Sequence, residues 1–227
     1  MSIANQEIPM TIVGVGPGDP EMLSLKGQHT IANADLVVGF KTVLNVIEKW
    51  VSTGELCPMS YRDQEEVLDY ARGEVAKGRS CVVCAWGDLN VSAKELIDRV
   101  RRRATTVTLV PGVSSIQFAC SRSGIYMEES LFITLHKRAD TGSDLEELLH
   151  HLNEGLRNII LLPRPFDLMP SLIAQNLIKE GVPPNRTIMV HQRLSLDGER
   201  SWEGSLQDCA DSSEEYSDLS IMVFKKD

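Results

Sequence analysis

The residues that decide the fold are 11–21, which read Thr11-Ile12-Val13-Gly14-Val15-Gly16-Pro17-Gly18-Asp19-Pro20-Glu21. The run begins with β-branched residues, which are typical of a buried strand, and then breaks into glycine and proline. A strand that ends in glycines can bring its backbone close to another group, because no side chains stand in the way. The stretch therefore predicts a substrate-facing loop at the C-terminal end of a parallel strand, or else an ordinary tight turn into a helix.

The glycine spacing argues against a dinucleotide-binding fingerprint. Gly14 and Gly16 match the first two positions of G-x-G-x-x-G, but the third position holds Asp19. Pro17 has no amide hydrogen to donate to a phosphate, and an acidic residue would repel a pyrophosphate. We therefore do not expect this loop to bind NAD.

The composition limits the classes of protein that the chain can belong to. Its 227 residues are 42% hydrophobic and 24% charged, as in soluble globular proteins. The net charge of −9 argues against nucleic acid as the main partner. Residues 1–9 do not resemble a signal peptide, and no apolar run is long enough to span a membrane, so we expect a cytoplasmic protein without a membrane partner.

The cysteines do not form an obvious site. The five cysteines are scattered along the chain, which fits a reducing compartment. Cys81-x-x-Cys84 has the spacing of a redox or zinc pair, but it lies inside an apolar run and has no second pair. We expect two small core residues on a strand.

Strands and helices alternate in the first half of the chain. After the first strand we expect strands at 36–39, 80–85 and 106–110, and helices at 20–33, 63–78 and 92–103. Asp63 is expected to cap its helix with Glu66 in a capping box. The basic run of Arg99 and Arg101-Arg102-Arg103 is expected to be a solvated helix end. This alternation predicts a parallel sheet with helices on both faces.

The second half has a different pattern. Strands are expected at 131–135 and 158–162, followed by a helix that Asp167 caps and Gly181 ends. Strands at 187–191, 201–205 and 219–224 then follow without strong helices between them, which indicates antiparallel pairing. The acidic residues 208–218 are expected to be a solvated helix or loop. The sequence thus predicts two α/β domains, 9–112 with a parallel sheet and 113–227 with a mixed sheet, and a cleft between them.

Three strand ends of the first half carry glycine together with a polar residue. These loops are Gly18-Asp19, Gly87-Asp88 and Gly112-Val113-Ser114-Ser115. Because the carboxyl ends of parallel strands meet at one edge of a sheet, we expect the three loops to border a ligand cleft.

These motifs resemble the tetrapyrrole (corrin/porphyrin) methylase family, and the resemblance extends from Thr11 to Phe224. The first loop matches the family's G-x-G-P-G-D, and Gly87-Asp88 stands where the family has G-D-P. Residues 201–206, Ser-Trp-Glu-Gly-Ser-Leu, are similar to its closing G-T-L strand. The resemblance implies a two-domain α/β fold, an S-adenosylmethionine-dependent methyltransferase and a homodimer.

Two segments are similar to one branch of that family, the cobalt-precorrin-7 (C5)-methyltransferases, or precorrin-6Y methylases, of cobalamin biosynthesis. They are residues 113–119, Val-Ser-Ser-Ile-Gln-Phe-Ala, and residues 135–138, Leu-His-Lys-Arg. The branch implies methylation of C5 of cobalt-precorrin-7 to give cobalt-precorrin-8, and a separate C15-methylating decarboxylase as a partner. Two positions depart from the family pattern, since Leu89 replaces a proline and Lys137 replaces a glycine.

The resemblance also assigns candidate cofactor-binding residues. Gly87 and Asp88 are two of these candidates, and the Asp88 carboxylate is suited either to accept hydrogen bonds from the amino or ribose groups of the cofactor or to cap a helix. Ser114 and Ser115 would bind the methionyl carboxylate, or act only as helix caps. The family resemblance implies an apolar wall for the cofactor, formed here by Leu161, Leu162 and Pro163. It also implies a segment beside the adenine, formed here by Gln192, Arg193 and Leu194. By periodicity alone, the two leucines are core residues.

The remaining candidates concern a substrate with several carboxylate arms. The candidate substrate-binding residues are Gly16, Pro17, Gly18, Lys41, Lys137 and Arg138, with Arg122 and Arg164 as further cations. As catalytic residues, Asp19 would bind a pyrrole N–H or cap a helix, and His136 would move a proton or be structural. The sequence contains no evident metal-ligand cluster, so cobalt would arrive with the substrate.

Two alternative functions remain open at this point. The chain could methylate another tetrapyrrole position or another acceptor, although its excess of acidic over basic residues argues against RNA as the acceptor. It could also be a nucleotide-binding module that catalyses no reaction.

Overall fold

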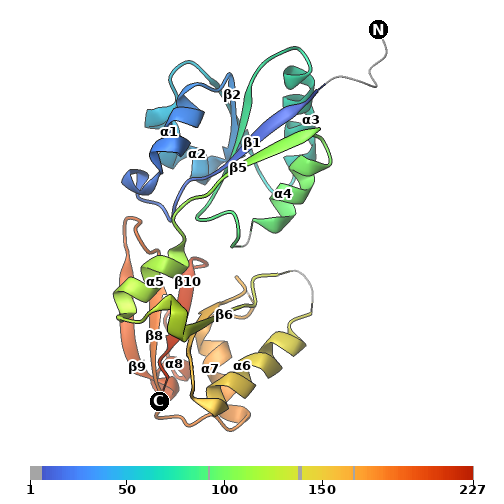
Figure 1. Ribbon diagram of the computed structural model, residues 1–227. Coiled ribbons are helices and arrows are strands. Elements are labelled where there is room, and N and C mark those ends of the chain that lie inside the picture. The colour runs from blue at the N-terminus through green and yellow to red at the C-terminus, as the bar shows by residue number, and fades with distance from the viewer. Residues whose placement is uncertain (1–6, 92, 138–139, 166, 227) are drawn as a thin grey trace. The chain divides into compact units, whose positions relative to one another are not determined.

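The computed structural model describes residues 7–91, 93–137, 140–165 and 167–226 (Figure 1). The chain divides into two compact units, Met1–Ser115 and Ile116–Asp227. Each unit contains one five-stranded sheet. Among the described residues, no helix has the length and apolar composition needed to cross a bilayer.

The sheet of the first unit is entirely parallel, as predicted, with the strand order β3-β2-β4-β1-β5. Its strands are β1 (Pro9–Gly14), β2 (Leu36–Phe40), β3 (Glu55–Met59), β4 (Cys81–Ala85) and β5 (Thr106–Val110). The helical segments are η2 (Pro20–Met22), α1 (Leu25–Ala32), α2 (Lys41–Ile47), η3 (Glu48–Trp50), α3 (Gln64–Val75) and α4 (Lys94–Arg101).

Helices cover both faces of this sheet, which explains why its central strands consist almost entirely of apolar residues. Alternate residues of a strand point to opposite faces. Val13, Val37 and Val82 therefore share one core cluster with residues of α1 and α2. Ile12, Val38 and Val83 share a second cluster with residues of α3 and α4. Figure 1 shows the two pairs of helices on opposite sides of the sheet, so this prediction is confirmed.

The Cys81-x-x-Cys84 pair consists of core residues, as predicted. The two side chains lie on opposite faces of β4, in different core clusters, and are 4% and 0% exposed. Burial raises the pKa of the Cys81 thiol to about 12, which keeps it protonated and unreactive.

The expected continuous helix at 20–33 is wrong. The chain forms the short helix η2, passes through the extended residue Leu23, and begins α1 only after Ser24. The Ser24 hydroxyl accepts a hydrogen bond from the Gly27 amide at 3.1 Å, so serine starts a new helix here. The capping box at Asp63 is also wrong, because the Asp63 carboxylate accepts from the Ser60 amide at 2.6 Å and makes no cap bond to its helix.

The basic run at the end of α4 is less solvated than predicted. Arg103 is only 11% exposed in its side chain and donates to Glu65 and Asp69 at 2.5 and 2.7 Å. Arg99 also pairs with Glu65. Glu65 and Asp69 belong to α3, so these arginines join two neighbouring helices.

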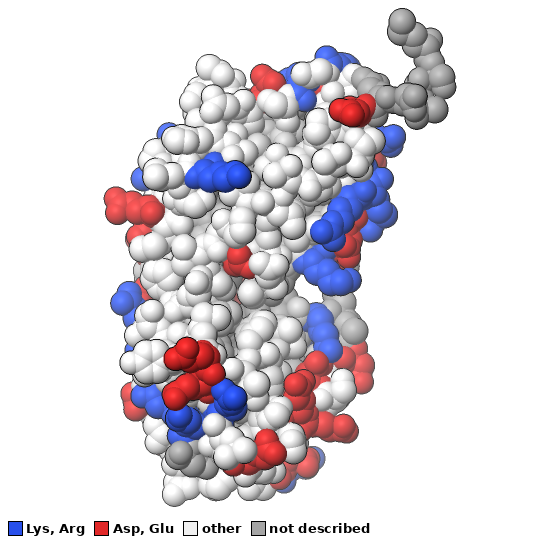
Figure 2. All heavy atoms as spheres, in the orientation of Figure 1, with Lys and Arg blue, Asp and Glu red and all other residues white. Residues whose placement is uncertain are grey.

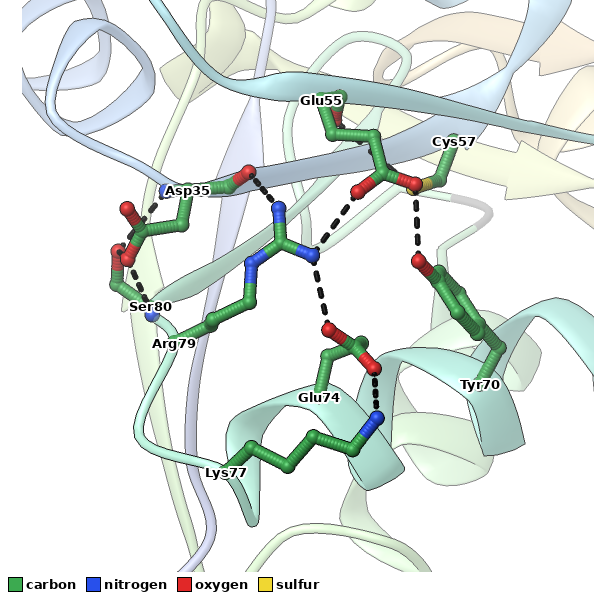
Figure 3. A network of polar contacts seen from close by, with 8 residues as sticks. All are labelled: Asp35, Glu55, Cys57, Tyr70, Glu74, Lys77, Arg79 and Ser80. Carbon is green, nitrogen blue, oxygen red and sulfur yellow. Dashed lines mark hydrogen bonds and ion pairs between the residues drawn. The ribbon is translucent and has the colours of Figure 1, made fainter.

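A polar network joins the segments at the amino ends of the strands (Figure 3). Arg79 lies just before β4 and donates to Glu55 of β3, Glu74 of α3 and the Asp35 carbonyl before β2, each at 2.9 Å. The Arg79 guanidinium and the Tyr70 hydroxyl hold the pKa of Glu55 below its usual value. One guanidinium thus crosslinks three elements on the edge opposite the glycine loops.

Replacing Arg79 with alanine should lower the unfolding temperature, by roughly 2–4 °C. The substitution leaves two carboxylates without their shared cation. Lys77→Ala is the matched control, because Lys77 contacts only Glu74 in this network and is 71% exposed in its side chain. Thermal unfolding of the two variants should show a clear loss for Arg79→Ala and little change for Lys77→Ala. Equal losses of unfolding temperature in the two variants would mean that the Arg79 contacts add no stability beyond that of the exposed Lys77–Glu74 pair.

The sheet of the second unit is mixed, as predicted, with the order β6-β7-β10-β8-β9. Only β6 and β7 are parallel, and the other neighbours are antiparallel. The strands are β6 (Ser130–Thr134), β7 (Asn158–Leu162), β8 (Thr187–Gln192), β9 (Arg200–Ser205) and β10 (Ser220–Phe224). The helical segments are α5 (Ser115–Ser123), η4 (Met127–Glu129), α6 (Gly142–Glu154), α7 (Pro170–Lys179) and α8 (Leu206–Ala210).

The core of this unit lies between the sheet and the helices α6, α7 and α8. Leu152, Leu177 and Cys209 of these helices share one cluster with Leu161 and Met222 of the sheet. In Figure 1, α5 lies over the other face of the sheet.

One prediction for this unit is wrong and another is confirmed. Asp167 does not cap α7, which starts at Pro170; its carboxylate instead accepts from Arg164 at 2.7 Å. The acidic residues within 208–218 are all exposed, as predicted for a solvated helix or loop, and the stretch begins in α8. Cys209 and Tyr216 of the same stretch are 0% and 8% exposed and belong to the core cluster of this unit.

Candidate functional site

The three glycine loops of the first unit meet at one edge of the sheet. They follow β1, β4 and β5, which are neighbours in the strand order. Gly16 and Gly87 exchange backbone hydrogen bonds of 3.2 and 2.8 Å, and Val15 donates to the Ala85 carbonyl at 2.9 Å. A Cβ on Gly14 would lie 2.6 Å from the Gly87 oxygen, and one on Gly112 would lie 2.5 Å from the Gly14 oxygen. The expected gathering is therefore confirmed, and it depends on glycine.

The first loop is buried and tightly held. Gly16, Pro17 and Gly18 are buried, and Gly16 has a φ of 89° that favours glycine. Asp19 is half-buried, and its Oδ1 accepts from the Glu21 amide at 2.8 Å, which caps η2. The capping role is thus observed, and the catalytic role remains a prediction. Lys41, by contrast, is the exposed first residue of α2, just after β2.

The second loop places Asp88 beside open space. A Cβ on Gly87 would meet nothing within 4 Å. Asp88 is half-buried, and its Oδ1 accepts from both the backbone and the side-chain nitrogen of Asn90 at 2.8 Å. Asp88 therefore closes a turn and does not cap α4, which starts at Lys94. Leu89, at the position of the family proline, is 4% exposed and anchors the loop in the core.

The third loop leads directly into a helix, as predicted. Ser114 is 7% exposed and Ser115 is the first residue of α5. Amides at a helix start favour a carboxylate, so this position suits the role assigned to the two serines.

In the second unit, parallel pairing brings two predicted segments together. Thr134 of β6 lies opposite Leu162 of β7, and the Leu135 amide donates to the Leu162 carbonyl at 2.9 Å. The strand ends continue into His136 and into Pro163, so these residues lie close together. Leu161 is 0% exposed and belongs to the core on the α6–α8 side, whereas Leu162 is half-buried and Pro163 is buried. His136 is exposed, and its amide donates to the Thr134 hydroxyl at 3.1 Å.

Three of the candidate substrate cations already have acidic partners. Lys137 pairs with Asp144 at 2.5 Å, Arg164 with Asp167 at 2.7 Å, and Arg122 with Glu199 at 2.8 Å. Arg138 lies outside the described residues. A carboxylate-bearing substrate would compete with these acidic partners.

The segment after β8 is held in an unusual backbone conformation. Arg193 and Ser195 have φ values of 54° and 62°, which are rare for residues other than glycine. Arg193 donates from Nε to the Asp197 carbonyl at 3.0 Å, and the Ser195 amide donates to Glu199 at 2.7 Å. Leu194 is 4% exposed. Such conformations occur where the surrounding structure enforces them, often at binding sites.

The sequence does not show how this segment is positioned. Gln192 is 1% exposed, donates to Glu214 at 3.0 Å and accepts from the Ser217 amide at 2.8 Å. Glu199 holds both the Ser195 amide and Arg122, which is 77 residues earlier. Partners so far apart in sequence leave no local signal.

His191 of β8 is a second residue that sequence analysis did not single out. It is 2% exposed, and its two ring nitrogens lie 2.7 and 2.8 Å from the hydroxyls of Ser123 and Ser201. Burial lowers the pKa of His191, Glu199 raises it and Arg122 lowers it. The ring therefore joins α5 and β9 in its neutral form.

This burial predicts a loss of stability in mild acid. The folded-state pKa of His191 lies below its ordinary value of 6.5, so the unfolded chain takes up the proton first. The contribution of the neutral His191 ring to the free energy of unfolding is complete above pH 6.5 and declines as the pH falls towards the folded-state pKa. Denaturant unfolding between pH 5 and 7 should show a flatter pH slope for His191→Gln than for the natural chain. His29→Gln, at an exposed histidine, should keep the natural slope; equal slopes in all three would refute the assignment.

Known proteins share this architecture. A uroporphyrin-III C-methyl transferase from Thermus thermophilus, solved as a complex with S-adenyl homocysteine, superposes with a TM-score of 0.72 at 21% identity, over 96% of this chain and 92% of that one. The chain thus has the fold of a two-unit α/β methyltransferase.

The sequence comparisons then identify the family. The profile of the tetrapyrrole (corrin/porphyrin) methylases matches residues 9–210, so the chain belongs to that family. It is a methyltransferase, and its methyl donor is S-adenosylmethionine, as predicted.

Two curated relatives come from Methanocaldococcus jannaschii. A probable cobalt-precorrin-7 C(5)-methyltransferase is 28% identical over 218 residues, covering 95% of this chain and 97% of the relative. A cobalt-precorrin-4 C(11)-methyltransferase is 26% identical over 209 residues, covering 88% and 80%.

Proposed function

We propose that this chain transfers a methyl group to C5 of cobalt-precorrin-7 and so forms cobalt-precorrin-8 in cobalamin biosynthesis. The observation that carries the proposal is the similarity to a relative named as a probable cobalt-precorrin-7 C(5)-methyltransferase, which aligns over nearly the full length of both chains. The Ser114-Ser115 and Leu135-His136 segments, which resemble the same branch, agree with it.

The glycine edge of the first unit fits an S-adenosylmethionine molecule. Open space above Gly87 lets a ligand approach the backbone, and the Asp88 carboxylate stands beside it. A carboxylate carries a second oxygen that can accept from a ribose hydroxyl or an amino group while Oδ1 holds the Asn90 turn. Ser114 and Ser115 at the start of α5 would hold the methionyl carboxylate.

In the second unit, the family resemblance assigns further residues to cofactor binding. Leu161, Leu162 and Pro163 would supply the apolar wall, and Arg193 and Leu194 would lie beside the adenine. The left-handed backbone at Arg193 supports this assignment, because a binding role would explain why a strained segment is kept.

When bound, the sulfonium of the cofactor supplies an activated methyl group and a neutral leaving group. The chain's contribution is to hold the donor and the acceptor carbon in line, which can lower a barrier by about 7–11 kcal/mol. Gly16, Pro17 and Gly18 would face the macrocycle, and Lys41, Lys137 and Arg138 would bind its carboxylates. Asp19 would accept from a pyrrole N–H, and His136 would take or return a proton as the ring carbon is alkylated.

The test follows the label into the product. The chain is incubated with S-adenosylmethionine carrying a ¹³C methyl group and with cobalt-precorrin-7, and NMR locates the labelled carbon. Label at C5 supports the proposal. Turnover only with cobalt-precorrin-4 and label at C11 would favour the second candidate, which rests on the second relative. Cofactor binding without turnover on any tetrapyrrole would favour a non-catalytic module.

We also propose that the chain is a cytoplasmic homodimer, with a separate C15-methylating decarboxylase acting beside it. Exposed apolar side chains of the first unit, such as Leu25 at 71% and Leu109 at 39%, could form a shared face. The five free, buried cysteines suit a reducing compartment. Light scattering that gave a monomer mass at micromolar concentration would contradict the dimer.

A further inference from the structure

The last turns of α6 bring two imidazoles and a carboxylate together. His150, His151 and Glu154 each offer a ligand atom, and these atoms all lie within 4.8 Å of one another. His150 Nε2 lies 3.5 Å from Glu154 Oε1, and His151 Nδ1 lies 3.3 Å from Glu154 Oε2. The carboxylate thus contacts both rings.

These separations suit a transition-metal ion. Zinc binds histidine nitrogen and carboxylate oxygen at about 2.0–2.2 Å, so neighbouring ligand atoms of a tetrahedral ion lie roughly 3.4 Å apart. The two imidazole–carboxylate contacts match this spacing. The distance between the two rings can close by rotation of the His150 side chain, which is 64% exposed.

The position on the helix favours a cation. The carbonyl end of a helix carries a partial negative charge, and α6 ends at Glu154 with Gly155 as its cap. Glu147 lies one helical turn before both histidines and is exposed. In Figure 2, acidic side chains gather at the lower right, where Figure 1 shows α6.

The helix backbone that carries the three side chains is fixed in the fold. Leu148 and Leu152 are 0% and 2% exposed and fix α6 against the core of the second unit. Because a folded helix presents the three ligands together, little conformational entropy is lost on binding.

We propose that His150, His151 and Glu154 form a binding site for a divalent cation of the zinc type, with water at its remaining coordination positions. Two nitrogens and one oxygen suit zinc and its transition-metal neighbours better than magnesium or calcium. The site is independent of the proposed methyl transfer. A bound ion would crosslink the last turn of α6 and stabilise the folded chain in proportion to the logarithm of the ion concentration.

Sequence analysis found no metal-ligand cluster because His150 and His151 are adjacent in sequence. On an ideal helix, neighbouring residues point about 100° apart. The two rings nevertheless approach, with centroids 4.9 Å apart, and Glu154 lies within reach of both.

The experiment is a calorimetric titration of the purified, metal-stripped chain with zinc chloride. One ion should bind per chain, and His151→Ala and Glu154→Gln should each weaken binding by more than about tenfold. His29→Ala, at an exposed histidine of the first unit, should bind zinc as the natural chain does. Thermal unfolding without metal shows whether each variant is folded. Added zinc should raise the unfolding temperature of the natural chain and of His29→Ala, but not that of His151→Ala or Glu154→Gln.

Two results would overturn the proposal. The first is the absence of a binding heat up to millimolar zinc. The second is binding that His151→Ala and Glu154→Gln leave unchanged, since the ion would then be held elsewhere. Cobalt(II) offers an independent readout, because its visible absorption should appear with the natural chain and with His29→Ala but disappear with the two site variants.

Discussion

Alanine at Gly112 is expected to destabilise the chain by roughly 3 kcal/mol and to suppress methyl transfer. The new Cβ would clash with the backbone oxygens of Gly87 and of Gly14, the latter at 2.5 Å. Backbone atoms cannot rotate away as a side chain can, so the ends of β1, β4 and β5 must separate. The loops that carry Asp19, Asp88 and Ser114 would then lose their positions.

Gly73→Ala is the matched control for this result. Gly73 lies within α3, and a Cβ there would meet nothing within 4 Å. Alanine should therefore raise stability by about 0.5–1 kcal/mol, the usual gain from glycine to alanine inside a helix. Denaturant unfolding and cofactor calorimetry test both variants. If Gly112→Ala kept natural stability and affinity, the close backbone approach would not be a constraint.

The second large effect separates the roles of Asp88 and Asp19. Replacing Asp88 with alanine should weaken the binding of S-adenosylhomocysteine by about 1.5–3 kcal/mol, or roughly 10- to 150-fold, if it makes a charge-assisted hydrogen bond to the cofactor. Asp88→Asn should lose less, because its amide oxygen can still accept from Asn90 and hold the turn. Asp19→Ala should leave this affinity nearly unchanged and lower turnover instead.

The comparison requires folded variants, so circular dichroism accompanies the calorimetry. Both carboxylates stabilise a local turn, Asp88 through Asn90 and Asp19 through Glu21. If a variant loses both its fold and its cofactor affinity, the loss of affinity is attributed to the broken turn and not to a missing contact with the cofactor. If Asp19→Ala lost the cofactor and Asp88→Ala retained it, the assigned roles would be reversed.

The charge distribution has a consequence for substrate binding. Lys137, Arg122 and Arg164 are engaged by Asp144, Glu199 and Asp167. A substrate carboxylate must therefore displace an internal partner from any of these cations that it binds. Among the candidate cations that the structure describes, Lys41 is exposed at the start of α2, and we propose that it makes the first contact with a substrate carboxylate.

Much of the architecture follows from local sequence patterns. The apolar runs around Val13, Val37 and Val82 predict central strands, because only a strand covered on both faces buries every residue. The glycines at the ends of β1 and β5 predict the close loops, and a side chain at Gly14 or Gly112 would clash with backbone atoms. The lack of phosphate-binding spacing around Asp19 argues against NAD as the cofactor.

Other features depend on contacts between residues that are far apart in the chain. The end of α4 depends on Glu65 and Asp69 of another helix. In the second unit, Glu199 reaches Arg122 and His191 reaches Ser123, at separations of 77 and 68 residues. The spacing of apolar residues and the residue preferences of turns involve only a few neighbouring residues, so both can be recognised in the sequence. Ion pairs, buried histidines and strained segments such as Arg193 arise only when the folding of a unit brings their distant partners together.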